Sequence, residues 1–172
     1  MKKQIARAIT AAVYAAVICA VTALISLPLP GGGYANPGDA FVLLGGLFLG
    51  PVYGALAAGI GSALADLLLG YIVYAPATVL IKAGMAALAS FLFLQLKVSP
   101  LRTPGALAVS AFCSEVLMIS GYFGYECLIY DVSGAMPGLA GNGLQGLVCF
   151  CLVLLLYPLL SRALSRAHLS RF

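Results

Sequence analysis

The chain has 172 residues, of which 63% are hydrophobic and only 8% are charged, and its net charge is +4. Soluble domains carry about 25% charged residues, so the composition excludes an ordinary soluble domain and indicates an integral membrane protein. The basic residues are few and scattered, which argues against a nucleic-acid partner. We expect one all-α membrane domain over residues 1–172.

Apolar segments separated by proline- and glycine-rich breaks predict six transmembrane helices, since each crossing needs about 20 residues. The first segment resembles a signal peptide, but no clear cleavage site follows it, so we expect it to be retained. The Gly50-Pro51 pair predicts a tight break, and the short helix before it is expected to be tilted. The predicted helices cover about 4–27, 39–49, 52–69, 76–96, 105–128 and 138–164.

The positions of Lys and Arg predict the orientation in the membrane. Short loops on the cytoplasmic side are enriched in these residues. They occur near the N-terminus, in the link after the fourth predicted helix and near the C-terminus, whereas segments 28–38, 70–76 and 130–137 hold none. This pattern predicts that both termini are cytoplasmic and that the three uncharged loops form the outer end.

Polar side chains gather in the outer half of the predicted bundle. A charge at bilayer depth costs several kcal/mol unless it is paired or faces water, so it usually has a function. Asp66 and Lys82 lie within one helical turn of the same depth and could pair. Asn142 and Gln145 lie three residues apart on one helix face, at the level of Glu126.

Amide, carboxylate, phenol and ammonium groups inside apolar walls suit a small, polar, aromatic ligand. The alternative is that each group only ties two helices together. Asp39 could instead cap the helix that begins there, and Glu115, near mid-depth, is interpreted as structural. The candidate binding residues are Tyr34, Asn36, Asp39, Lys82, Tyr122, Glu126, Asn142 and Gln145, with Asp66 and Glu115 as support.

Two ridges of small residues predict close helix contacts. In the third predicted helix, the ridge of Gly50, Gly54, Ala58, Ser62 and Asp66 is best explained by internal packing. In the first helix, small residues repeat every four positions, and this ridge could equally dock another subunit. It consists of Ala8, Ala12, Ala16 and Ala20.

Enzyme chemistry finds little support in the sequence. His168 is the only histidine and lies in the predicted cytoplasmic tail, which argues against a histidine-assisted nucleophile within the bilayer. Phosphate-loop and zinc-protease motifs are missing, and the five cysteines have no metal-site spacing. We therefore expect no cofactor, metal site or ATPase activity, so energy for any transport would come from a gradient or a partner.

A series of motifs follows along the chain: GYANPGD at 33–39, GP at 50–51, DLLLGY at 66–71, YAP at 74–76 with IKAG at 81–84, GYF at 121–123 with Glu126, and GNGLQ at 141–145. Together they resemble the substrate-binding S component of energy-coupling factor (ECF) vitamin transporters. The similarity spans almost the whole chain. It is closest to the hydroxymethylpyrimidine/pyridoxine-type group, whose members are often labelled riboflavin-type.

This resemblance implies a multi-pass protein of the cell membrane with six helices and an outward-facing pocket capped by the first loop. It implies that the alanine ridge docks a membrane coupling subunit, the T component, and that two ABC-type ATPases power toppling of the S component. The alternatives are a riboflavin-specific S component and a non-transport membrane scaffold. A self-sufficient secondary transporter would favour internal repeats, and we see none.

Overall fold

A computed structural model describes residues 2–28, 34–98 and 102–166 of the chain. Predictions that concern other residues, such as His168, lie outside this range. Apart from two short paired strands, the described regular structure is all α-helical, as predicted. The elements are α1 (Lys2–Leu24), β1 (Leu27–Pro28), β2 (Tyr34–Ala35), α2 (Gly38–Leu69), α3 (Ala75–Leu96) and α4 (Arg102–Arg166).

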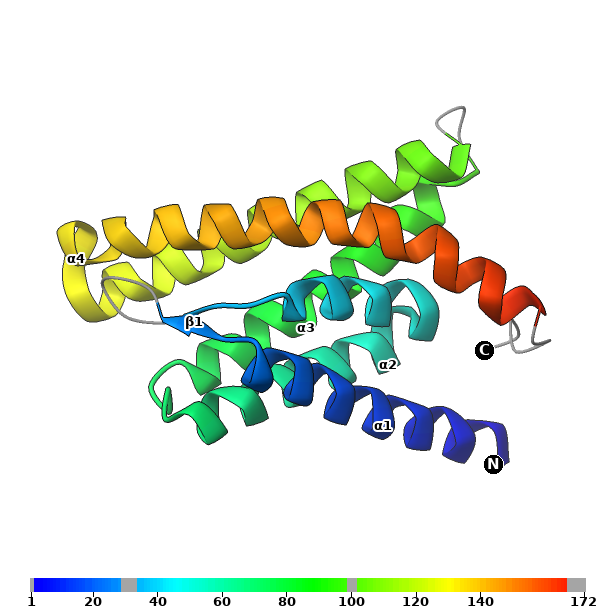
Figure 1. The fold of residues 1–172 in the computed structure, drawn as a ribbon, viewed down its shortest axis with the longest axis horizontal. Coiled ribbons are helices and arrows are strands. Elements are labelled where there is room, and N and C mark those ends of the chain that lie inside the picture. Colours follow the sequence, from blue (N-terminus) through cyan, green and yellow to red (C-terminus); the bar gives the residue numbers. More distant parts are fainter. Residues whose placement is uncertain (1, 29–33, 99–101, 167–172) are drawn as a thin grey trace.

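Both long helices reverse direction at a single non-helical residue (Figure 1). In α2 this residue is Gly50, whose φ of 83° favours glycine, and Pro51 follows it. The predicted break at Gly50-Pro51 is therefore confirmed. In α4 the residue is Asp131, with φ of 66°. Instead of six separate helices, the described residues form four, two of which contain a reversal.

The predicted loop at 130–137 is wrong beyond Asp131, because the residues after it are helical. The Asp131 carboxylate accepts hydrogen bonds from Ser133 Oγ at 2.6 Å and from the Gly134 N–H at 3.0 Å. A side-chain acceptor at this position stabilises a helix start, so the second arm of α4 begins at once. The first helix is also shorter than predicted, since Leu27 pairs with Ala35 across the two strands.

All four helices are long and apolar enough to cross a membrane by length and composition. Their outer faces carry large exposed apolar side chains, for example Ile9, Ile60, Leu80 and Phe112. Exposing such apolar surface to water is unfavourable, whereas contact with lipid is not. The protein is therefore an all-α membrane protein.

Close backbone contacts hold α2 against its neighbours. At Gly46 a Cβ atom would lie 2.1 Å from the Ala86 carbonyl oxygen of α3, and at Gly61 it would lie 2.4 Å from the Ala15 carbonyl oxygen of α1. The ridge of small residues predicted in this helix is buried at Gly54, Ala58, Ser62 and Asp66. Its predicted role in internal packing is thus confirmed.

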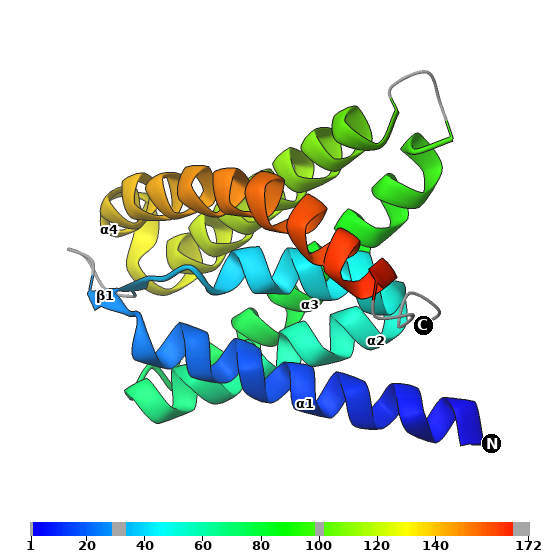
Figure 2. The same cartoon turned by 45° about the vertical axis from the view of Figure 1, so that its right-hand side comes forward.

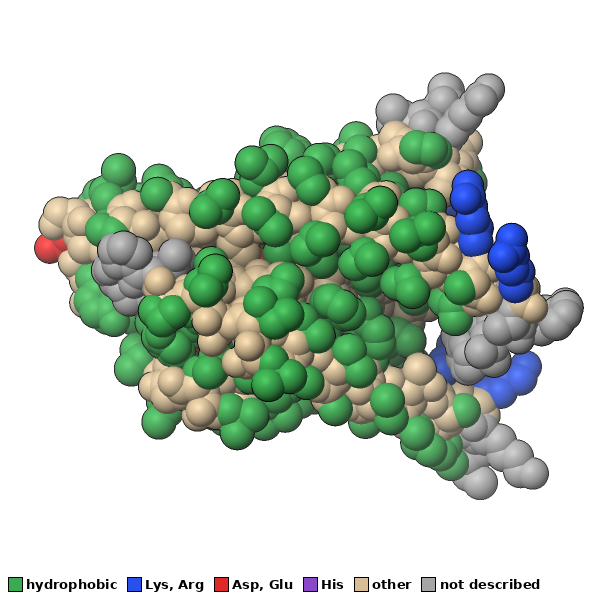
Figure 3. All heavy atoms as spheres, in the orientation of Figure 1, with side chains coloured by type: hydrophobic (Ala, Val, Ile, Leu, Met, Phe, Trp, Pro, Cys, Tyr) green, Lys and Arg blue, Asp and Glu red, His purple; other side chains and the backbone are tan. Residues whose placement is uncertain are grey.

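The two ends of the bundle differ. In Figures 1 and 2 both termini lie at one end, and β1 and the reversal of α4 lie at the other. On the face shown in Figure 3, the Lys and Arg side chains gather at the end that carries the termini. The strands therefore mark the end that is poor in basic residues.

Candidate binding site

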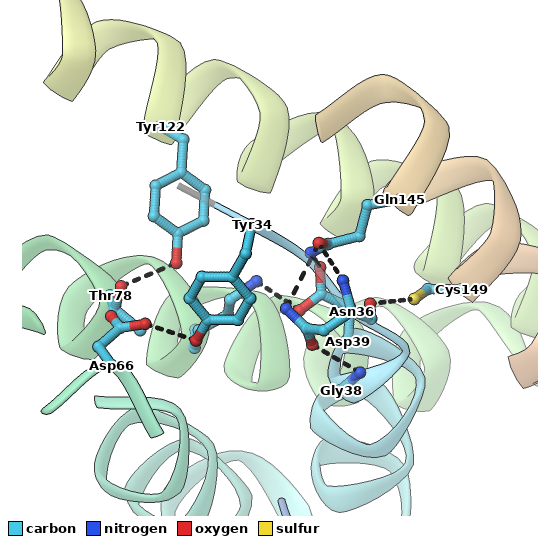
Figure 4. Close-up of polar contacts among 10 residues, drawn as sticks. Tyr34, Asn36, Gly38, Asp39, Asp66, Thr78, Tyr122, Gln145 and Cys149 are labelled. Atoms are coloured by element: carbon cyan, nitrogen blue, oxygen red, sulfur yellow. Dashed lines mark hydrogen bonds and ion pairs between the residues drawn. The ribbon is translucent and has the colours of Figure 1, made fainter. Parts of the chain in front are cut away.

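A polar cavity lies inside the bundle, near the end that carries the strands (Figure 4). Its empty space is about 510 Å³, a volume that includes open solvent at the mouth. All of the predicted binding residues line it except Asp39, and Asp66 lines it too. The cavity is lined by Thr22, Tyr34, Asn36, Ser62, Asp66, Tyr74, Thr78, Lys82, Tyr122, Glu126, Gly138, Asn142 and Gln145.

Lys82, which lines the cavity, belongs to a buried ion pair. Lys82 Nζ pairs with Asp39 Oδ1, and the two side chains are 5% and 1% exposed. Gln145 Nε2 donates to the other Asp39 oxygen at 2.6 Å. The expected Asp66–Lys82 pair is wrong, because the first arm of α2 brings Asp39 to Lys82 instead. Asp39 also makes no helix cap, since its two oxygens are taken up by these partners.

The segment that enters α2 crosses the cavity and is tied to distant helices. The backbone N–H of Asn36 donates to Gln145 Oε1 at 2.8 Å, and Asn36 Oδ1 accepts from the Gly38 N–H at 2.7 Å. Tyr34 donates its hydroxyl to Asp66 Oδ1 at 2.6 Å. Burial, followed by the Asp66 carboxylate, raises the pKa of Tyr34 well above its usual value, so this phenol stays protonated and remains a donor.

Aromatic rings also line the cavity. Tyr122 shares a hydrogen bond with Thr78 Oγ1 at 2.9 Å, and Lys82 Nζ lies 5.1 Å from the centre of the Tyr122 ring. Tyr34, Tyr71 and Tyr74 follow one another with ring centres 4.8 and 6.3 Å apart. Tyr34, Tyr74 and Tyr122 therefore form part of the cavity's wall.

Glu126 is held against a glycine. Its Oε1 accepts a hydrogen bond from the Tyr74 hydroxyl at 3.4 Å. A Cβ atom at Gly138 would lie 2.2 Å from Glu126 Oε2, so only glycine leaves room for the carboxylate there. The reversal of α4 at Asp131 brings these two residues, from its two arms, together.

Glu115 does not line the cavity, and neither of its carboxylate oxygens has a hydrogen-bond partner among the described residues, so its structural role stays a prediction. Its carboxylate, Asp39 and Cys149 each place one ligand-type atom within 4.8 Å of the others. Asp39 already accepts from Lys82 and Gln145, and the Cys149 thiol donates to the Asn36 carbonyl oxygen at 3.5 Å. A neighbouring ammonium group disfavours a metal cation at this cluster.

Sequence reasoning missed Thr22, Ser62, Tyr74, Thr78 and Gly138 as residues of the cavity. For three of them the signal is helical spacing. Tyr74 and Thr78 precede Lys82 by eight and four residues, and Ser62 precedes Asp66 by four, so each pair shares a helix face. No such spacing points to Thr22 or to Gly138.

Apolar helices of membrane length around a polar cavity define a multi-pass membrane protein with an internal polar cavity. A family model described as the S component of ECF-type riboflavin transporters matches residues 2–162. The chain belongs to this family of substrate-binding subunits of vitamin transporters. It is also 28% identical over 120 residues to an uncharacterized protein in the gap 3′ region of Pyrococcus woesei, covering 69% of this chain and 77% of the relative.

Proposed function

We propose that this S component captures a small heteroaromatic vitamin or vitamin precursor, such as hydroxymethylpyrimidine or pyridoxine, for ATP-driven uptake. The observation that carries this proposal is the polar cavity lined by Asn36, Gln145 and Lys82, whose ammonium group is held by Asp39. Buried polar groups that converge on a cavity fix the orientation of a ligand. A scaffold protein has no need of such a cavity.

The alternative is a riboflavin-specific subunit, which the family's description favours. Both substrates are flat heteroaromatic rings with donors and acceptors along their edges, so the amides of Asn142 and Gln145 suit either. The two proposals differ in which molecule the purified protein retains.

We propose six membrane crossings within a single domain, with the cavity open to the outside. The reversals at Gly50 and Asp131 divide α2 and α4 into two arms each, which supports this count. The termini and the visible basic side chains lie at one end, which supports cytoplasmic termini.

The face of α1 that carries the alanine ridge is proposed as the docking site for a T component, which would link the protein to two ABC-type ATPases. Ala8, Ala12, Ala16 and Ala20 are all exposed. Ala11 and Ala15 are buried against Ala57 of α2. The ridge therefore remains free for a partner helix.

The test is to purify the protein in detergent, denature it and identify the released small molecule by mass spectrometry. Calorimetry with hydroxymethylpyrimidine, pyridoxine and riboflavin then ranks the candidates. Retention or tight binding of one of the two smaller rings supports the first proposal, and selective binding of riboflavin supports the alternative. A protein that retains nothing and binds none of the three would favour the scaffold.

A further inference from the structure

The cavity offers hydrogen-bond acceptors that no described protein group uses. Glu126 Oε2 and Asp66 Oδ2 are buried and have no partner within hydrogen-bond distance among residues 2–28, 34–98 and 102–166, although the Thr78 hydroxyl lies beside the Asp66 carboxyl. Both residues line the cavity, and they are only 4% and 3% exposed. A buried acceptor without a partner is unfavourable, so each of these oxygens lacks a donor that a ligand would supply.

The charges of the residues around the cavity are a second observation. Among the described residues that line the cavity, Lys82 carries the positive charge. Asp39 already neutralises this ammonium group. Asp66 and Glu126 accept hydrogen bonds from the hydroxyls of Tyr34 and Tyr74, which carry no charge. Among the described residues, neither of the two carboxyl groups forms an ion pair with a Lys or Arg side chain, and buried charges are stable when they are paired.

The walls add aromatic surface. Tyr34, Tyr74 and Tyr122 all line the cavity. Aromatic faces attract organic cations, and they do so more strongly away from water. Carboxylates together with tyrosine rings are the groups that recognise a positively charged nitrogen.

From these observations we infer that the site selects an organic cation. The ligand would be a small heteroaromatic ring carrying a protonated amino or amidine-type group, whose N–H donors face Glu126 Oε2 and Asp66 Oδ2. This inference rests on the proposed function and narrows the charge of its substrate. It disfavours neutral and anionic members of the same class.

Matched probes test this inference directly. Pyridoxamine and pyridoxine differ in an aminomethyl group in place of a hydroxymethyl group, and 4-amino-5-aminomethyl-2-methylpyrimidine and its 5-hydroxymethyl analogue form a second pair. Calorimetry at pH 7 on the purified protein compares the members of each pair, with riboflavin as a neutral reference. For at least one pair we expect the aminomethyl probe to bind about 10-fold tighter or more, because hydrogen bonds to charged groups are the stronger ones.

Isosteric variants assign the preference to the two carboxylates. Glu126→Gln and Asp66→Asn should each reduce the preference for the cationic probe about 10-fold while changing the affinity for the neutral probe much less. Asp131→Asn is the control, because this exposed carboxylate lies outside the cavity and its loss should leave the preference unchanged. Thermal unfolding of each variant checks folding, and if one variant does not fold, the other decides.

Equal or tighter binding of the hydroxymethyl probes overturns the inference and leaves the proposed function in place, as does selective binding of riboflavin. A fall in affinity that is equal for both members of a pair overturns it too, since the carboxylates would then be structural. If no probe binds, the charge of the molecule released from the purified protein decides: a cation supports the inference, and a neutral or anionic molecule overturns it. If nothing binds and nothing is released, the proposed function fails, and the inference fails with it.

Discussion

Gln145 connects three parts of the site through one side chain. Its Oε1 accepts from the Asn36 backbone, and its Nε2 donates to Asp39, which in turn holds Lys82. Both ends of the amide are therefore satisfied inside the bundle. Loss of this side chain would leave one oxygen of the buried Asp39 carboxylate and the Asn36 backbone N–H without partners.

At Gln145, replacement by alanine should weaken ligand binding about 5- to 150-fold, corresponding to about 1–3 kcal/mol for the unsatisfied groups. Calorimetry with the retained ligand measures this change. Leu144→Ala is the matched control, because Leu144 is the preceding residue and is 62% exposed. Equal affinities for the two variants would exclude Gln145 from the site.

Lys82→Met should lower the stability of the protein by about 3–5 kcal/mol, since it leaves the Asp39 carboxylate buried without its cation. Thermal unfolding in detergent measures the loss. The double variant Asp39→Asn, Lys82→Met removes both charges and should recover part of it. A double variant that is less stable than Lys82→Met would contradict this account of the pair.

Sequence reasoning suggested Asp66 as the partner of Lys82, whereas Lys82 pairs with Asp39. Rise along a helix gives the depth of a residue, and by that measure Asp66 is an equally good partner. The choice depends on which arm of α2 faces Lys82, and that is set by packing such as the Gly46–Ala86 contact. Spacing within one helix, as for Asn142 and Gln145, was sufficient to predict a shared face.

At the scale of elements, α2 contacts both α1 and α3, and glycines permit the closest contacts. The reversal at Gly50 was predictable because glycine followed by proline breaks a helix. The reversal at Asp131 was not placed correctly, since Ser133, Gly134 and Pro137 are typical of a loop. The capping hydrogen bonds of Asp131, which need the folded turn, start the helix earlier.

Gly61→Ala should destabilise the protein by about 1–3 kcal/mol, because the added methyl group has no room beside the Ala15 backbone. Thermal unfolding in detergent is the measurement. Gly143→Ala is the control, since a Cβ atom at Gly143 would meet no atom within 4 Å. If both variants are equally stable, the α1–α2 contact is looser than described.

At the scale of the whole molecule, orientation follows from the two chemically different ends. Single cysteines replacing Val132 and Val98, which are 62% and 82% exposed, should report opposite sides in a cysteine-free background. An impermeant thiol reagent added to intact cells should label position 132 and not position 98, because basic residues stay inside. The reverse pattern would invert the proposed topology.

Coupling should depend on the exposed alanine ridge of α1. The combined change Ala12→Trp, Ala16→Trp should abolish copurification with the ATPase subunits and uptake, because bulky side chains hold helices apart. Ligand binding by the isolated protein should be unaffected. Leu147→Trp, at an apolar position of α4 that is 61% exposed, is the control, and a double variant that still copurifies would exclude the ridge as the docking face.

The hydrogen bond between Asn36 and Gln145 joins residues 109 positions apart, and this separation has a consequence for biosynthesis. When α1 to α3 have entered the membrane, Asp39 and Lys82 can pair, but the amide that completes their network is still to be translated. The ligand site therefore closes only after the second arm of α4 is inserted. A ribosome that stalls before residue 145 would leave a nascent chain whose Asn36 and Asp39 groups lack their Gln145 partner within the membrane, which is unfavourable in lipid.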